Sequence, residues 1–161
     1  MSLRLRSAII AFAVVILDRL SKLYINRAYA PWDVTMVVPR IFNIVHAENQ
    51  GGAFSMLADA PPLVRGVLLV GVSAMVMTGV GIMFWRLPKN VNWLMPTSLA
   101  LVFGGAFGNL WDRVFRGSVT DFLQVFIGSY EFPSFNVADS AITVGAALLA
   151  VDLLRTRKTP A

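Results

Sequence analysis

Long apolar stretches with charged residues at their edges dominate the hydrophobic pattern of this chain. A membrane-crossing helix needs about 20 mostly apolar residues, and two stretches, Gly66 to Trp85 and Val91 to Trp111, reach that length without a charged side chain. Two weaker stretches are interrupted by charge, the first by Asp18 and Lys22 and the second by Asp139. Because the chain has little polar sequence, we expect these two apolar helices to lie in the bilayer as well. We therefore predict one membrane-embedded domain, residues 1–161, with spans at about 7–27, 63–86, 91–113 and 136–154.

The charge distribution predicts how these spans are oriented. Hydrophobic residues make up 57% of the chain and charged residues 14%, whereas about 25% of the residues of a soluble domain are charged. The net charge of +5 comes from basic clusters at span edges, so it indicates membrane topology and no nucleic-acid partner. Three clusters fall on one side, which is the cytoplasmic side by the positive-inside rule, and both termini are predicted there. Their members are Arg4, Arg6, Arg86, Lys89, Arg155, Arg157 and Lys158.

The connections on the outer side contain strand-like segments. The first, at about 28–62, is too long for a turn and has β-branched runs at 34–38 and 41–46. The segment 119–126 in the second outer connection has the same character. We expect a small β-sheet lying on the outer membrane surface. Small residues in the second and third spans further predict close helix packing; the glycines among them are Gly66, Gly71, Gly79, Gly81, Gly104, Gly105 and Gly108.

Ionisable side chains inside the spans are costly and by default indicate a functional site. Asp18 and Lys22 lie four residues apart on one helix face and can neutralise each other, so a structural ion pair is their simplest interpretation. Asp112 and Arg113 are adjacent and point apart, and each needs a partner on another element. Counting along the spans places these groups near the outer surface, where Asp121 and Asp139 also fall.

Asp121 and Asp139 differ from the other acidic residues because no basic residue stands at helical spacing to pair with either. Two carboxylates in a poorly solvated site share one proton and titrate as a unit. Aspartic peptidases use such a pair, in which the ionised member activates water and the protonated member polarises the scissile carbonyl. From the residues alone the alternative stays open that Asp139 caps the fourth span and Asp121 closes a turn.

Other chemistries find little support in the sequence. The chain has no cysteine and one histidine, His46, so no metal site or cofactor is expected, and His46 is expected at a surface or interface. Membrane carboxylates also build ion relays, but four short helices without inverted repeats are a poor basis for a transporter or proton channel. A structural or adaptor protein would have little reason to gather polar residues at one depth.

Five sequence blocks, taken in order, are similar to those of the bacterial lipoprotein signal peptidase family, signal peptidase II. The blocks are D-R-L-S-K from Asp18, E-N-Q-G-G-A-F-S from Glu48, G-G-A-F-G-N-L-W-D-R from Gly104, R-G-S-V-T-D-F from Arg116 and F-N-V-A-D from Phe135. The resemblance implies a multi-pass aspartic endopeptidase of the bacterial inner membrane. It removes the signal peptide of prolipoproteins, at the outer face, after the lipobox cysteine has received diacylglycerol.

The resemblance also implies a fold, a site and partners. The fold is an all-α membrane protein with four transmembrane helices, a small extracytoplasmic β cradle and a short helix that clamps the substrate. The partners are lipidated prolipoproteins, membrane lipids and globomycin-type inhibitors. The three asparagines of the site can offer amide donors to the substrate or to its carbonyl oxygen as charge develops. The catalytic residues are Asp121 and Asp139, and the substrate-binding or supporting residues are Asp18, Lys22, Asn49, Gly51, Asn109, Arg113, Asn136 and Ala138.

Overall fold

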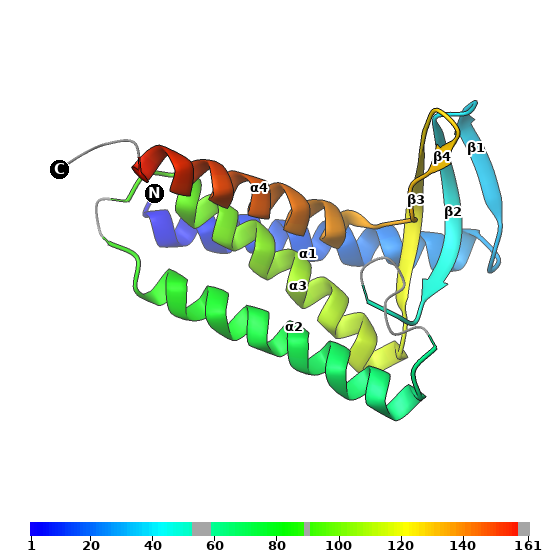
Figure 1. Ribbon diagram of the computed structural model, residues 1–161, viewed down its shortest axis with the longest axis horizontal. Helices are drawn as coiled ribbons and strands as arrows, with labels where there is room; N and C mark the ends of the chain where they lie inside the picture. The colour runs from blue at the N-terminus through cyan, green and yellow to red at the C-terminus, as the bar shows by residue number, and fades with distance from the viewer. Residues whose placement is uncertain (53–58, 89–90, 158–161) are drawn as a thin grey trace.

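The chain forms a group of long helices with a small sheet at one end. The computed structural model describes residues 1–52, 59–88 and 91–157. Figure 1 shows the sheet at one end of the helices, while the amino end of α1 and the carboxyl end of α4 lie at the other. The helices are α1 (Leu3–Ala28), α2 (Pro62–Trp85), α3 (Leu94–Arg116) and α4 (Val137–Arg157), and the strands are β1 (Val34–Val38), β2 (Phe42–Asn49), β3 (Val119–Ile127) and β4 (Tyr130–Glu131).

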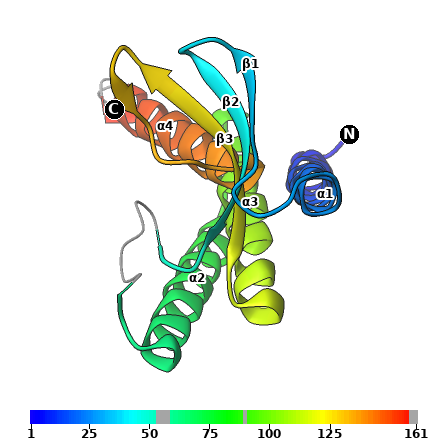
Figure 2. The same ribbon diagram turned by 90° about the vertical axis from the view of Figure 1, so that its right-hand side faces the viewer.

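Helix α3 is central and contacts each of the other three helices, which surround it in the end-on view of Figure 2. Glycines make this packing close. A Cβ atom added to Gly104 would lie 2.8 Å from the carbonyl oxygen of Ala11, and one added to Gly108 would lie 2.5 Å from Oδ2 of Asp18. The close approach predicted for the third span is therefore confirmed.

The same prediction is wrong for the second span. Each glycine of α2 has no atom within 4 Å of the position its Cβ would take, and α2 buries none of its residues. Helix α2 lies at the edge of the group, and its glycines leave open space where a closely packed neighbour would stand.

The surface of α1 is apolar and its buried face is polar. Asp18 and Lys22 are 0% and 1% exposed, whereas Phe12 is 68% exposed. This distribution is unfavourable in water and favourable in lipid, where apolar side chains face hydrocarbon and polar groups are satisfied inside the protein. Among the described residues, three helical segments are long and apolar enough to cross a membrane, namely Pro62–Trp85, Leu94–Arg116 and Val137–Arg155. The chain is a multi-pass membrane protein.

The strands form an antiparallel sheet of order β1-β2-β3-β4, and the predicted strand segments are confirmed. A register shift between Ile44 and Ala47 is followed by the pairs Ala47 with Asp121 and Glu48 with Thr120. Since successive side chains of a strand point to opposite faces, Asp121 lies on one face of the sheet and Thr120 on the other.

The short clamp helix was expected without a residue range. The described residues between β2 and α2 include no helix. Residues 53–58 lie outside the described part of the chain, so the clamp helix stays a prediction.

Candidate active site

The two carboxylates singled out in the sequence meet at Asn136. Asp121 comes from β3 and Asp139 from the first turn of α4. The Nδ2 of Asn136 donates to Oδ1 of Asp121 at 2.7 Å, and its backbone N–H donates to Oδ2 of Asp139 at 3.2 Å. Asn136 is 0% exposed. The structure therefore brings the two acidic groups into one site, within a hydrogen bond of the same residue.

Asp139 also caps α4. Its backbone N–H donates to Oδ1 of Asn136 at 2.9 Å, while its own Oδ2 accepts from the Asn136 N–H, which is the reciprocal pattern of a capping box. The other oxygen, Oδ1, accepts from Nδ2 of Asn109 at 2.7 Å. The capping interpretation of Asp139 is thus correct as a description of the helix end. The cap also fixes where the carboxylate points, so it is compatible with catalysis.

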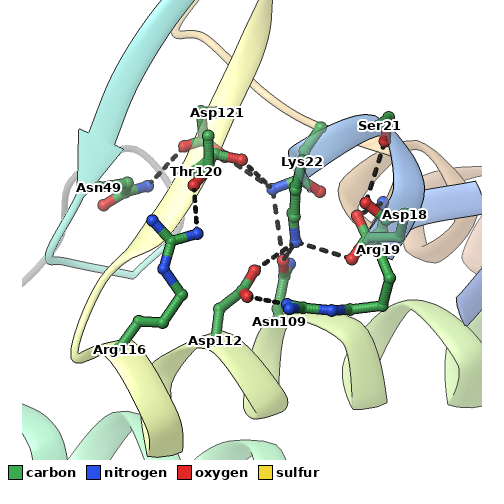
Figure 3. A network of polar contacts seen from close by, with 12 residues as sticks. Asp18, Arg19, Ser21, Lys22, Asn49, Asn109, Asp112, Arg116, Thr120 and Asp121 are labelled. Carbon is green, nitrogen blue, oxygen red and sulfur yellow. Dashed lines mark hydrogen bonds and ion pairs between the residues drawn. The ribbon is translucent and has the colours of Figure 1, made fainter. Parts of the chain in front are cut away.

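Asp121 is buried beside another acid. It is 3% exposed, and its Oδ2 accepts from Nδ2 of Asn49 at 3.0 Å, as Figure 3 shows. Burial, together with the nearby charge of Asp139, raises the pKa of the Asp121 carboxyl to about 7, although the hydrogen bonds from Asn49 and Asn136 act in the opposite direction. Its environment therefore favours the protonated form of Asp121 more than that of an ordinary carboxyl group.

The amides of Asn49, Asn109 and Asn136 donate to the two carboxyl groups. These contacts orient the acids, and the expected role of the amides toward the substrate stays a prediction. The side-chain oxygen Oδ1 of Asn109 also has a partner, because Nζ of Lys22 donates a hydrogen bond to it at 3.0 Å. An ammonium group only donates, so Lys22 fixes which end of the Asn109 amide faces Asp139.

A buried ion cluster lies directly below the site (Figure 3). Nζ of Lys22 is 2.8 Å from Oδ2 of Asp18 and 2.8 Å from Oδ2 of Asp112. The predicted pairing of Asp18 with Lys22 is confirmed, and Asp112 has the expected partner on another helix. Sequence reasoning missed Arg19, whose guanidinium pairs with Asp112. Its position within an apolar helix was the available signal, since an arginine there also needs a carboxylate.

Asp18 connects this cluster to the start of α4. Its Oδ1 accepts from the backbone N–H of Ala138 at 3.0 Å, where a negative charge is favoured by the amino end of the helix. Ala138 is 0% exposed, and Gly108 lies against the Asp18 carboxylate. A larger side chain at either position would push α1, α3 and α4 apart and move Asp139 with them.

Arg113 and Gly51 join α3 to the segment after β2. Nη2 of Arg113 donates to the carbonyl oxygen of Gly51 at 3.3 Å, and the Gly51 N–H donates to Oδ1 of Asn49 at 2.9 Å. Hydrogen bonds thus link Arg113 to Asp121 through Gly51 and Asn49, and its charge also interacts with Asp139 and Asp121. Its Nε is buried and makes no hydrogen bond within the described ranges, which leaves one donor for a ligand. Within those ranges no group of three or more His, Cys, Asp or Glu side chains is placed to hold a metal ion.

Comparison with known proteins gives a consistent result. A family model described as "Signal peptidase (SPase) II" matches residues 10–155. A lipoprotein signal peptidase of Pseudomonas putida is 42% identical over 93% of this chain and 87% of its own, and one of Geobacter sulfurreducens is 43% identical over 91% of each. A solved bacterial membrane enzyme superposes with a TM-score of 0.84 at 30% identity, covering 95% of this chain and 90% of its own.

Proposed function

Since the chain belongs to the signal peptidase II family, we propose that Asp121 and Asp139 are the catalytic pair with which it cleaves signal peptides from prolipoproteins. It is an aspartic peptidase by family. The observation that carries the residue assignment is the contact of Asn136 with both carboxyl groups. The substrate we propose has a diacylglyceryl-modified lipobox cysteine, and cleavage takes place at the outer face of the bacterial inner membrane, with the lipid chains remaining in the bilayer.

The contacts support a division of roles between the two acids. Asp139, oriented by Asn109 and by the cap of α4, is the carboxylate that takes a proton from water. Asp121 carries the proton of the pair and donates it as a hydrogen bond to the scissile carbonyl oxygen, which gains negative charge as the water oxygen attacks the carbon. Asp139 then returns its proton to the leaving amide nitrogen. Nε of Arg113, which makes no hydrogen bond to the part of the chain that the structure describes, is a donor for a substrate carbonyl beside the pair.

This division predicts the pH dependence of cleavage. An acid with a raised pKa is protonated below that pKa and loses its proton above it, so kcat/KM for a lipidated prolipoprotein should fall as pH rises through about 7. The measurement is cleavage by purified enzyme in detergent across the neutral range. Globomycin should block the activity at every pH, which separates it from a contaminating soluble peptidase. A rate that keeps rising well above neutrality would contradict the assignment of the proton to Asp121.

We also propose that all four helices cross the membrane with both termini in the cytoplasm. The polar buried face and apolar exposed face of α1 support a first span despite its charges. The amino end of α1 and the carboxyl end of α4 lie at the same end of the molecule, away from the sheet (Figure 1). Such an arrangement puts the sheet and the catalytic pair on the outer side.

Single introduced cysteines can test this topology because the chain has none of its own. Arg40→Cys, in the turn between β1 and β2, should react in intact cells with a maleimide that crosses only the outer membrane. Arg86→Cys, at the end of α2, should react only after the inner membrane is permeabilised. Both residues lie outside the helices and strands. Equal labelling of the two variants in intact cells would contradict the topology.

A further inference from the structure

A second polar cluster lies on the face of the sheet opposite Asp121 and is centred on Glu48. Its carboxylate is 26% exposed and accepts four side-chain contacts from three elements and a loop. Ser118 Oγ donates to Oε2 at 2.6 Å, whereas Oε1 is approached by Nε2 of His46 at 3.1 Å, Nη2 of Arg116 at 3.2 Å and Oγ1 of Thr120 at 3.2 Å. Nothing in the mechanism above uses this carboxylate.

His46 is 5% exposed and bridges the carboxyl end of α1 to Glu48. Nδ1 lies 2.9 Å from the carbonyl oxygen of Tyr29, at the carboxyl end of α1, and Nε2 lies 3.1 Å from Oε1 of Glu48. The ring therefore connects β2 to the end of α1 as well as to the Glu48 carboxylate.

Glu48 is a carboxylate in this environment. Partial burial raises the pKa of Glu48, but hydrogen bonds from Ser118 and His46 and the charge of Arg116 outweigh it, and the net shift is downward. The charged groups that face His46 are therefore Glu48 on β2 and, beyond it, Arg116 on α3. From α1, the group that faces the ring is the backbone carbonyl of Tyr29.

The cluster is one residue away from the active site on both strands. Glu48 precedes Asn49, and its cross-strand partner Thr120 precedes Asp121. Thr120 is 0% exposed, and its Oγ1 accepts from Nη1 of Arg116 at 3.0 Å (Figure 3) and lies 3.2 Å from Oδ1 of Asn26 on α1. The cluster thus fastens β2 and β3 to the outer ends of α1 and α3.

We propose that Glu48 is a positioning residue for the peptidase reaction: through its contacts with His46 and Arg116, it holds β2 and β3 so that Asn49 and Asp121 face Asp139. The proposal rests on the proposed catalytic pair. A displacement of about 1 Å in a reacting group lowers a rate by about a hundredfold. Because the cluster lies behind the strands and away from the carboxyl pair, kcat responds and KM changes little.

The test compares Glu48→Gln, His46→Gln and the double variant with the parent enzyme. Each single change should lower kcat by about tenfold or more, and the double variant should be no slower than the slower single one, because the two residues act as a unit. Glu131→Gln is the matched control: its carboxylate accepts one hydrogen bond, from Gln124 at 2.7 Å, on an exposed part of the same sheet. It should keep the parent kcat.

The split between kcat and KM separates positioning from simple stabilisation. Glu48→Gln should lower kcat per folded enzyme, whereas KM for the lipidated prolipoprotein should change little. A loss of stability alone would lower the amount of folded enzyme and leave the kcat of that enzyme unchanged. A Glu48→Gln kcat within about twofold of the parent, or a change confined to KM, would overturn the proposal.

Two further variants allow each outcome to be interpreted. Ser118→Ala replaces Glu48→Gln if the latter yields too little protein. It removes one hydrogen-bond donor to Glu48 while leaving the charges in place, so a smaller loss of kcat is expected. Asp121→Asn tests the proposed catalytic pair, on which the positioning role depends. If Asp121→Asn still cleaves the substrate, the catalytic pair is wrong; if it is inactive while Glu48→Gln retains full kcat, only the positioning role fails.

Discussion

Replacing Asp121 or Asp139 by asparagine is expected to abolish cleavage of a lipidated prolipoprotein. An amide matches the carboxylate in shape and can keep a hydrogen bond from Asn136 or Asn109, but it neither takes a proton from water nor carries the shared one. Removal of one member of a catalytic set that acts as a unit costs about four orders of magnitude in rate. The measurement is conversion of a diacylglyceryl-modified preprotein by each purified variant.

Because asparagine has nearly the same shape as aspartate, these variants distinguish loss of catalysis from loss of folded protein. Both variants should accumulate in the membrane and melt near the parent temperature in detergent, because neither change creates an unpaired buried charge. Asp33→Asn, at an exposed position just before β1, should cleave like the parent. Cleavage at the parent rate by either active-site variant would show that the pair is misassigned.

The spans and strands could be predicted because their signals are local. Apolar runs and β-branched segments stand next to each other in the sequence, and β1 occupies 34–38, the range predicted for it. The end of the third span shows the limit of this approach. The apolar run stops at Trp111, before Asp112 and Arg113, but the helix continues to Arg116 and ends at Gly117, whose φ of 76° is suited to a left-handed helix end. Backbone conformation, not hydropathy, sets that boundary.

The sequence also named the two acids, Asp121 and Asp139, that the structure brings to one site. Their catalytic role stays a prediction, and the contacts that support them could not be predicted. Asn109 reaches Asp139 across 30 positions of sequence, and Arg19 reaches Asp112 across 93. Such pairs depend on which helix faces meet, and here glycines such as Gly104 and Gly108 decide how closely α1 and α3 approach. The glycines predict close packing, but the local sequence does not say which helix faces meet.

The Glu48 cluster was missed for a related reason. In the sequence His46 and Glu48 look like exposed polar residues of an outer connection. Their role emerges only from the register that sets Glu48 opposite Thr120. A slip by one residue would turn both side chains to the other face of the sheet.

Replacing Lys22 by methionine is expected to have the largest effect on stability. Lys22 is 1% exposed and neutralises two buried carboxylates, Asp18 and Asp112. Removing one partner of a buried ion pair costs about 3–5 kcal/mol because the remaining charges are left uncompensated. The Asn109 amide also loses the donor that orients it. The variant should melt well below the parent in detergent, and any folded fraction should cleave slowly.

A neutral version of the cluster tests whether charge balance or the lysine itself is responsible. Arg27→Met, an exposed cation on the same helix, should change the melting temperature little, since surface substitutions cost within about 0.5 kcal/mol. Adding Asp18→Asn to Lys22→Met removes the uncompensated charge and leaves Arg19 paired with Asp112, so stability should partly return. Activity should stay low, because no ammonium then holds Asn109 against Asp139. A double variant that recovered both stability and the parent rate would show that Lys22 serves packing alone, and that Asp139 keeps its orientation from the cap of α4 without help from the ion cluster.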